Sequence, residues 1–256
     1  MAANMVSGNV KTAYDEFYQE HDEAWRMLGA KYKAQHIIEV CKGRSFKKVL
    51  EVGAGDGSIL KHLSDNNFAA EYHAVEISDS GVAHIRSRNI GQLVSVQEFD
   101  GYHLPFEDNS FDLIILSHVL EHVEHERILL RELKRVSEYA VIEVPLDYKP
   151  GVDKRIKHFL AYGHINMYTP TSLRYLLQSE GFEIQQQLTS IIEPEVTRFN
   201  TYINQKKQKS FIKDIRIVTE YVVKAGMSKL TDKLNEQLAS AYTVLCKKSN
   251  RQADIF

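Results

Sequence analysis

The most informative part of the sequence is Val49-Leu50-Glu51-Val52-Gly53-Ala54-Gly55-Asp56-Gly57-Ser58-Ile59-Leu60. Its first residues are an apolar run that predicts a buried strand, and the residues from Ser58 onward have helical spacing. Glycine at three alternate positions between them lets the backbone approach a ligand closely, because a side chain there would clash. A helix N-terminus after such a turn suits the polar end of a ligand. The stretch therefore predicts a parallel α/β sheet with a ligand site at the end of its first strand.

The chain around this stretch alternates short apolar runs with helical patterns, which is typical of βαβ units. Strands are expected at residues 49–52, 72–76, 93–96, 111–117 and 139–144, and helices at 58–63, 80–88 and 119–136. Further on, Thr169 as N-cap and Pro170 at the first helical position predict a helix that ends at Gly181. Strands at 182–188 and 240–246 follow. We therefore expect an α/β fold with a Rossmann-like, doubly wound sheet of seven strands.

Helical patterns flank this region and divide the chain into three expected parts. Residues 1–45, rich in tyrosine and charge, predict an N-terminal helical cover over the sheet. Residues 46–190 together with 238–249 are the expected core. Residues 191–237 carry apolar residues at helical spacing and predict a helical insertion before the last strand. This insertion would serve as a lid or, if the chain forms a homo-oligomer, as the contact between its copies.

The composition excludes several classes of protein. The 256 residues carry a net charge of −2, with 43% hydrophobic and 26% charged residues, which is ordinary for a globular chain and unlike a disordered one. Cys41 and Cys246 lie far apart with no Cys/His spacing of a zinc site, so neither a disulfide nor a structural metal is indicated. A reducing, cytoplasmic setting fits this cysteine usage. No stretch approaches the roughly 18 apolar residues of a membrane span, and no leader pattern is present.

Basic residues are concentrated at the end of the chain. Residues 201–256 contain 11 Lys and Arg against 5 Asp and Glu. They are spaced through amphipathic patterns without interleaved aromatic clusters, which favours solvated helix faces over a nucleic-acid surface. We therefore expect no nucleic-acid partner.

Two cofactor classes use a glycine turn of this kind, and the spacing of the glycines separates them. The dinucleotide fingerprint G-x-G-x-x-G would need its third glycine at Ser58, so it is absent in that register. Residues 51–57 instead read as an acid followed by G-x-G-x-G, and they resemble motif I of the class I S-adenosylmethionine-dependent methyltransferases. Further along, Glu76 ends the second expected strand, where a carboxylate can accept both hydroxyls of a ribose.

Three later segments resemble the same family in the same order. Residues 99–112 are similar to the segment in which an aspartate binds the adenine amino group before an "lPf.d.sFD" run. Residues 113–123 resemble the fourth strand and following turn, and residues 163–173 resemble the "H...yt...l..ll...Gf" stretch of small-molecule methyltransferases. The resemblance covers about residues 14–184 and the last strand. It implies S-adenosyl-L-methionine as cofactor and S-adenosyl-L-homocysteine as product.

The resemblance also implies a cofactor site along the carboxyl ends of the strands. It assigns Glu51, Gly53, Ala54, Gly55 and Gly57 to the methionine part of the cofactor, Glu76 to the ribose, Ile77 to the adenine face, and Asp100, Gly101 and Tyr102 to the adenine edge. Ser117 and His118 are expected near the sulfonium, and Tyr18 in an N-terminal segment that closes over the cofactor. Packing against the sheet is the alternative for Tyr18, because it shares a helix face with Tyr14.

Histidines are the candidate catalytic residues, because an oxygen or ammonium nucleophile must lose a proton and imidazole is a suitable acceptor. The candidates are His118, His122 and His164, with helix packing or a polar loop contact as the alternative for the last two. His118, Glu121 and His122 form an H-x-x-E-H string that also marks one class of zinc metalloprotease. Such a site requires both histidines within one helix, whereas the strand at 111–117 ends directly before His118. No metal is therefore expected.

The predicted function is methyl transfer to an oxygen or nitrogen atom of a small molecule, such as a sugar or another biosynthetic intermediate. The [ND]-P-P-[YF] tetrapeptide of many amino-methylating enzymes is replaced after the fourth strand by Ser117-His118-Val119-Leu120. Two alternatives stay open. One is a regulatory module that binds S-adenosylmethionine or its product without turnover, and the other is a nucleotide-cofactor oxidoreductase, which Ser58 disfavours.

Overall fold

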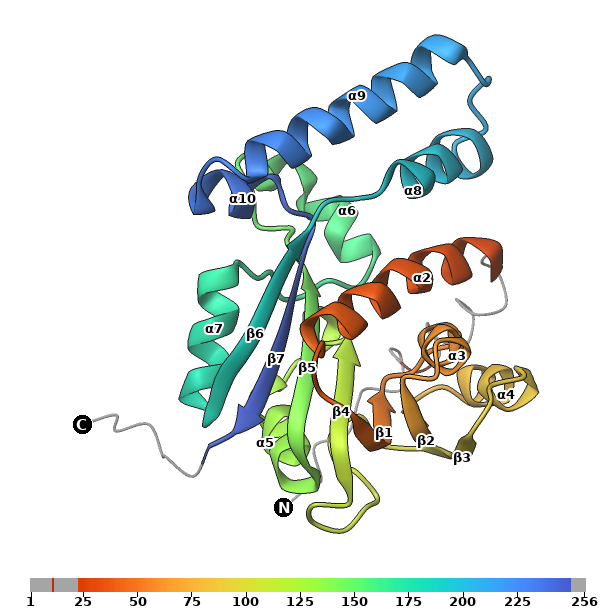
Figure 1. The fold of residues 1–256 in the computed structure, drawn as a ribbon, viewed down its shortest axis with the longest axis vertical. Coiled ribbons are helices and arrows are strands. Elements are labelled where there is room, and N and C mark those ends of the chain that lie inside the picture. The colour runs from red at the N-terminus through yellow and green to blue at the C-terminus, as the bar shows by residue number, and fades with distance from the viewer. Residues whose placement is uncertain (1–10, 12–22, 250–256) are drawn as a thin grey trace.

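The computed structural model describes residue 11 and residues 23–249, which form one seven-stranded sheet with helices on both faces (Figure 1). The strands are β1 (Phe46–Val52), β2 (Ala69–Glu76), β3 (Leu93–Glu98), β4 (Phe111–Ser117), β5 (Ser137–Pro145), β6 (Phe182–Ser190) and β7 (Ala241–Lys248). Their order in the sheet is β3-β2-β1-β4-β5-β7-β6. All pairs are parallel except those of β7, which runs antiparallel to β5 and β6. The predicted α/β, doubly wound sheet is confirmed.

Two layers of helices bury the two faces of the sheet. One face is covered by α2 (Glu23–Val40), α3 (Ser58–Asp65) and α4 (Asp79–Ser87), and the other by α5 (Glu126–Val136) and α7 (Pro170–Ser179). The apolar spacing of α5 places Leu129, Leu130, Leu133 and Val136 in the core, each fully buried. Helix α7 begins as expected, with a capping box between Thr169 and Ser172 and with Pro170 in its first turn.

One expected helix is interrupted. The sequence predicts a continuous helix over 119–136, but the structure has a short 3₁₀ turn, η1 (Leu120–His122), and α5 begins only at Glu126. The carbonyl groups that a continuous helix would use are taken by the loop before α7. The side-chain amide of Asn166 donates to the carbonyl oxygens of Leu120 at 3.0 Å and Val123 at 2.6 Å, and the backbone amide of Ile165 donates to that of Glu121 at 2.8 Å. The prediction was wrong here because these partners lie far away in the sequence.

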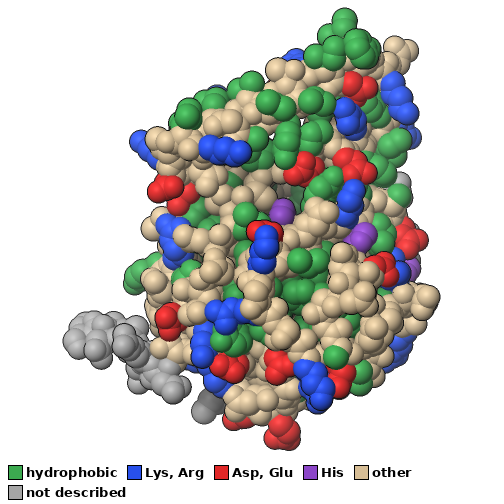
Figure 2. All heavy atoms as spheres, viewed as in Figure 1, with side chains coloured by type: hydrophobic (Ala, Val, Ile, Leu, Met, Phe, Trp, Pro, Cys, Tyr) green, Lys and Arg blue, Asp and Glu red, His purple; other side chains and the backbone are tan. Residues whose placement is uncertain are grey.

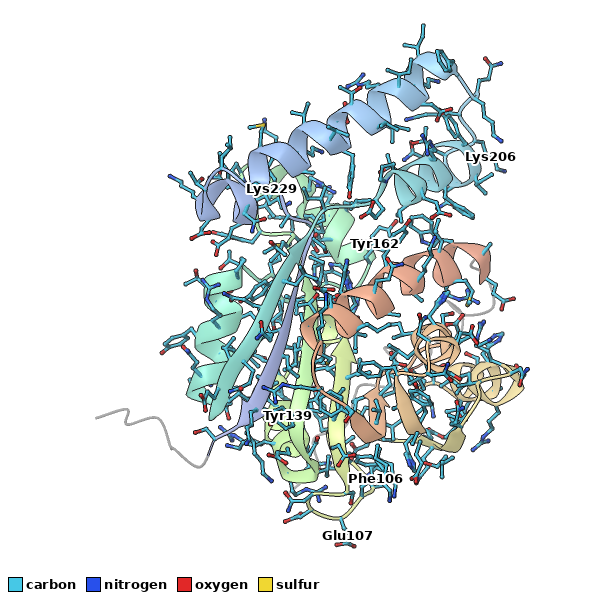
Figure 3. The ribbon with its side chains drawn as sticks, in the orientation of Figure 1. Phe106, Glu107, Tyr139, Tyr162, Lys206 and Lys229 are labelled. Atoms are coloured by element: carbon cyan, nitrogen blue, oxygen red, sulfur yellow. The ribbon has the colours of Figure 1, made fainter. Side chains whose placement is uncertain are left out.

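A helical block lies beyond the carboxyl ends of the parallel strands (Figure 1). It contains α8 (Pro194–Phe199), the π-helical turn η3 (Asn200–Asn204), α9 (Phe211–Ser228) and α10 (Asp232–Leu238), in the segment predicted to be helical. The sequence did not predict two short helices, η2 (Val152–Arg155) and α6 (Ile156–Ala161). Figure 1 shows α6 beneath the helical block. Figure 3 shows Lys206 beside α8 and Lys229 at the opposite end of the helical block, whereas Phe106 and Glu107 lie at the far end of the molecule.

Side chains of α2 hold the helical block against the body of the molecule. The carboxylate of Glu195 in α8 accepts a hydrogen bond from the Tyr32 hydroxyl at 2.7 Å and from the Lys31 ammonium at 2.8 Å. The rings of Trp25 and Phe199 lie 5.6 Å apart between their centroids.

Among residues 23–249, no helix has both the length and the apolar character that a bilayer span requires.

Candidate functional site

The glycine turn after β1 takes backbone conformations that only glycine adopts readily. Gly53, Gly55 and Gly57 all have positive φ, at 69°, 60° and 77°. A Cβ atom on Gly53 would lie 2.7 Å from a methyl carbon of Val119. The N-terminus of α4 packs equally closely, since a Cβ on Gly81 would lie 2.8 Å from the Gly55 carbonyl oxygen. The turn thus packs tightly against Val119 and against the N-terminus of α4. This packing suits a loop whose backbone faces a ligand.

Glu51 lies at the end of β1, next to this turn, and is 1% exposed. Its Oε2 atom accepts no hydrogen bond from any described residue. Burial raises the pKa of Glu51 well above its ordinary value, in spite of the nearby positive charge of Lys33. A buried acceptor without a donor is costly, at about 1–3 kcal/mol. The position therefore favours a ligand that brings a donor, such as an ammonium group.

Glu76 ends β2 and is fixed against the same turn. Its Oε2 accepts a hydrogen bond from the Gly55 amide at 2.7 Å, and its Oε1 accepts one from the Ile77 amide at 3.0 Å. The residue is 3% exposed. A third hydrogen bond, from the Ser78 amide to Oε1 at 3.3 Å, completes these backbone contacts, which orient Glu76 at the end of β2.

Asp100 lies in the loop after β3. Its Oδ1 accepts hydrogen bonds from the amides of Tyr102 at 2.8 Å and His103 at 2.7 Å, and its Oδ2 pairs with the His103 ring. Burial acts to raise the pKa of Asp100, but these donors hold it below its ordinary value. Gly101 has φ 93° and Tyr102 is buried. The loop predicted to contact adenine is therefore held in shape by its own aspartate.

Glu143, at the end of β5, is a buried acceptor for four side chains. Its Oε2 accepts from Thr243 Oγ1 at 2.6 Å and from Nδ1 of His36 at 2.9 Å. Its Oε1 accepts from Nε2 of His118 at 3.1 Å and from Ser117 Oγ at 3.4 Å. Burial acts to raise the pKa of Glu143, but His118 and His36 hold it far below its usual range. Glu143 and His36 were not predicted as site residues, although a lone acid within the apolar run of β5 was a usable signal.

His118 follows β4 directly, as predicted, and has a strained backbone. Its φ of 57° lies in the left-handed region, which is uncommon outside glycine and concentrates at functional sites. Its ring lies between two buried glutamates, Glu143 and Glu121, with Nδ1 3.4 Å from Glu121 Oε1. Burial and Lys33 act to lower the pKa of His118, but the two glutamates raise it above its ordinary value.

The other two candidate histidines lie together, although they are far apart in sequence. The ring centroids of His122 and His164 are 4.9 Å apart. Nδ1 of His164 is 2.7 Å from Oδ2 of Asp147, and Nδ1 of His122 is 3.0 Å from the Gly163 carbonyl oxygen. Burial lowers the pKa of His122, and nearby His164 acts in the same direction. The loop that carries His164 thus reaches the turn that follows β4.

A cleft of about 430 Å³ opens beside these residues, between the ends of the strands and the helical block. It is lined by His36, Lys33, His118, Glu143, His164 and Lys149 together with apolar residues of the helical block and of the strand ends. Figure 2 shows the surface hollowed below that block, with a histidine side chain visible in the hollow. Figure 3 shows Tyr162 between α9 and the ends of the strands. Nζ of Lys33 makes no hydrogen bond or ion pair with any residue of the described part of the chain.

The structure brings together most of the residues predicted for the site. Ser117, His118 and His164 lie at the cleft or in contact with its walls, and the predicted cofactor residues lie at the ends of β1, β2 and β3. His122 lies behind His164 and is not among the residues that line the cleft. Tyr18 lies outside the described residues.

Known proteins resemble this chain in both sequence and structure. A family model described as a methyltransferase domain matches residues 21–187. Over 124 residues the chain is 25% identical to "Putative methyltransferase YrhH" of Bacillus subtilis (strain 168), a match that covers 46% of this chain and 69% of that protein. Over 109 residues it is 32% identical to "Ubiquinone/menaquinone biosynthesis C-methyltransferase UbiE" of Shewanella sp. (strain W3-18-1), covering 40% of this chain and 43% of UbiE. The matched stretch therefore spans less than half of UbiE.

Solved structures share the fold. The crystal structure of a SAM-dependent methyltransferase from Archaeoglobus fulgidus superposes with a TM-score of 0.55 at 21% identity, and the match covers 93% of this chain and 99% of that one.

Proposed function

The chain belongs to the methyltransferase domain family, within the class I S-adenosylmethionine-dependent methyltransferases, and we propose that it transfers a methyl group to an oxygen or nitrogen atom of a small molecule. The observation that carries this proposal is the cleft of about 430 Å³ at the ends of β4 and β5, which His118, Glu143 and His164 line. Its volume is in the range of small-molecule sites, at about 300–1,000 Å³. It lies at the carboxyl ends of the strands, where open α/β sheets bind ligands. Family membership removes the oxidoreductase alternative.

For the cofactor, we propose the site that the sequence predicted. Bound S-adenosylmethionine supplies a methyl group on a positively charged sulfur. The buried, unpartnered Oε2 of Glu51 would accept a hydrogen bond from its ammonium group, and the turn of residues 53–57 would lie along its methionine part. Glu76 would bind the ribose, with Ile77 on the adenine face and the loop of Asp100 at its edge. Ser117 and His118 would lie closest to the sulfonium.

For the acceptor, the basic side chains of the cleft favour a molecule with an acidic group, because the carboxylates that also line it, Glu143, Asp147 and Glu193, already have side-chain partners. Lys33, Lys149 and Arg155 line the cleft, and the Arg155 guanidinium lies 4.8 Å from the centroid of the Phe159 ring. His164, oriented by the carboxylate of Asp147, is placed to contact the acceptor. Methyl transfer is an in-line displacement, so these residues would act mainly by aligning the acceptor and excluding water.

We propose that residues 191–237 form a wall of the acceptor cleft and act as a lid, that residues 1–45 cover the sheet, and that 46–190 with 238–249 form the catalytic core. Ile192, Glu193 and Val196 line the cleft, which supports the first role. An oligomer contact through the same block is a second use, since Phe211 and Ile212 of α9 are 79% and 78% exposed.

The test is a coupled assay for S-adenosylhomocysteine, with acceptors drawn from sugars, hydroxy acids, amines and phosphorylated metabolites. Mass spectrometry and NMR of the product locate the methyl group. We expect product with a methylated oxygen or nitrogen and more turnover with acidic acceptors than with their neutral analogues. A product methylated on carbon would overturn the proposed acceptor atom. Tight binding of S-adenosylmethionine with no turnover across the panel would favour the regulatory module instead.

A further inference from the structure

A compact cluster of potential metal ligands lies behind the acceptor cleft. Glu121, His122 and His164 each offer one ligand atom, and these atoms all lie within 4.8 Å of one another. The first two residues belong to the 3₁₀ turn η1, and the third belongs to the loop before α7. Nε2 of His122 is 3.9 Å from Oε1 of Glu121. Two histidines and one carboxylate are the ligand set of many divalent transition-metal sites.

The state of Glu121 is the second observation that points to a ligand. The residue is 1% exposed, and neither of its carboxylate oxygens accepts a hydrogen bond from any described residue. Nδ1 of His118 lies 3.4 Å from Oε1 but makes no hydrogen bond with it. Buried carboxylates are normally paired, hydrogen-bonded or bound to a metal. Both oxygens of Glu121 thus have acceptor capacity that the surrounding chain does not use.

Partners on Nδ1 orient the two histidine rings. Nδ1 of His122 contacts the carbonyl oxygen of Gly163, and Nδ1 of His164 contacts the carboxylate of Asp147. In each ring, Nε2 is therefore the nitrogen that would bind a metal. Metal-binding histidines almost always have such a carboxylate or carbonyl partner on the second ring nitrogen. Gly163 has φ 73°, and a Cβ there would lie 3.3 Å from Nδ1 of His122. The close approach of the two segments therefore depends on glycine at this position.

We propose that Glu121, His122 and His164 form a binding site for a divalent first-row transition-metal ion, such as Zn²⁺, Co²⁺ or Fe²⁺. No metal was expected from the sequence, because the H-x-x-E-H string was compared with a zinc site in which one helix carries both histidines. The structure differs in two ways: the string forms a tight turn, and His164 arrives from a distant loop. His118 of the string is not a member of the cluster.

The position of the cluster suggests what the metal does, and this part rests on the proposed methyl transfer. His164 belongs to both the cluster and the lining of the cleft, so a metal with three protein ligands would have open positions toward the acceptor. An acceptor with two neighbouring oxygens, such as a diol or a hydroxy acid, would bind there. Its hydroxyl proton would pass to water, its oxygen would bond to the methyl carbon, and the electron pair of the broken carbon–sulfur bond would remain on sulfur. His164 would then act as a ligand that positions the acceptor.

The experiment measures metal binding alone, so that its failure and the failure of methyl transfer are distinguishable. Full-length protein, stripped of metal with a chelator, is titrated with CoCl₂ and followed by visible absorption, with ZnCl₂ as the competitor and with neither cofactor nor acceptor present. We expect one Co²⁺ per chain, displaced by Zn²⁺. Glu121→Gln and His164→Ala should each weaken Co²⁺ binding by at least about 100-fold, more than the effect of losing an outer partner.

His158→Ala is the matched control, because this histidine lies in α6 near His164 but outside the cluster. It should bind Co²⁺ as the wild type does. Circular dichroism and thermal unfolding establish that each variant is folded, and His122→Ala replaces any variant that is not. The proposal is overturned if folded wild-type protein binds no Co²⁺, or if the folded cluster variants bind it with unchanged affinity.

Discussion

Replacing Glu143 with glutamine tests whether this buried carboxylate organises the site. The substitution keeps the size of the side chain but removes its charge and turns one of its two acceptor atoms into a donor. If the new NH₂ group replaces Oε1, it faces the donors Ser117 and His118. If it replaces Oε2, it faces the donors Thr243 and His36. The hydroxyl groups can rotate to accept a hydrogen bond, but the histidines lose the charge that Glu143 supplies.

The size of the effect follows from these contacts. A hydrogen bond to a charged group contributes about 1.5–3 kcal/mol, and breaking a buried ion pair costs about 3–5 kcal/mol. Because the hydroxyl groups can adapt, we expect Glu143→Gln to lower the free energy of unfolding by about 2–4 kcal/mol. Urea denaturation followed by circular dichroism measures it. Thr243→Val, which removes a single donor from the same carboxylate, is the control and should cost about 1 kcal/mol. A loss below about 1 kcal/mol for Glu143→Gln would show that the charge of Glu143 does not stabilise the site.

Three further predictions concern the cofactor turn, the acceptor and an ion pair. Gly55→Val should abolish binding of S-adenosylmethionine in calorimetry while the circular dichroism spectrum stays native, because a β-branched residue disfavours positive φ and fills the turn; unchanged affinity would remove the turn from the cofactor site. His164→Ala should lower kcat more than it lowers affinity for S-adenosylmethionine, and equal turnover would exclude His164 from the mechanism. Asp56 is paired with Arg26 at 2.8 Å and Arg88 at 2.9 Å; burial acts to raise its pKa, but its donors, including the two arginines, lower it. Its stabilising contribution is therefore complete above the unfolded pKa of about 4 and is lost as pH falls further, so the stability difference between wild type and Asp56→Asn, about 3 kcal/mol at pH 7, should shrink below pH 4. A difference that stays constant down to pH 2 would contradict it.

Much of the fold could be predicted from the sequence, because local patterns determine it. Most of the seven strands appear as apolar runs, and the glycine turn has its own spacing. Thr169 and Pro170 predict where helix α7 begins. The break before α5 had no such signal, since it depends on Asn166, more than forty residues further along the chain.

The site was predictable only in part, because several of its contacts join residues that are far apart in the sequence. Positions at the ends of strands, such as Glu51 and His118, follow from topology. The partners of Glu143 come from β4, β7 and α2, and no local pattern links them. The contact between His122 and His164 likewise depends on how two loops pack. Residues that meet through tertiary contacts of this kind are found only once the structure is known.

Whether the chain binds S-adenosylmethionine is decided by a calorimetric titration with S-adenosylmethionine, S-adenosylhomocysteine and NAD, repeated with Gly55→Val. We expect micromolar binding of both sulfur compounds to the wild type, no heat with NAD, and no binding of any of the three to the variant. Heat with NAD and none with the sulfur compounds would contradict it.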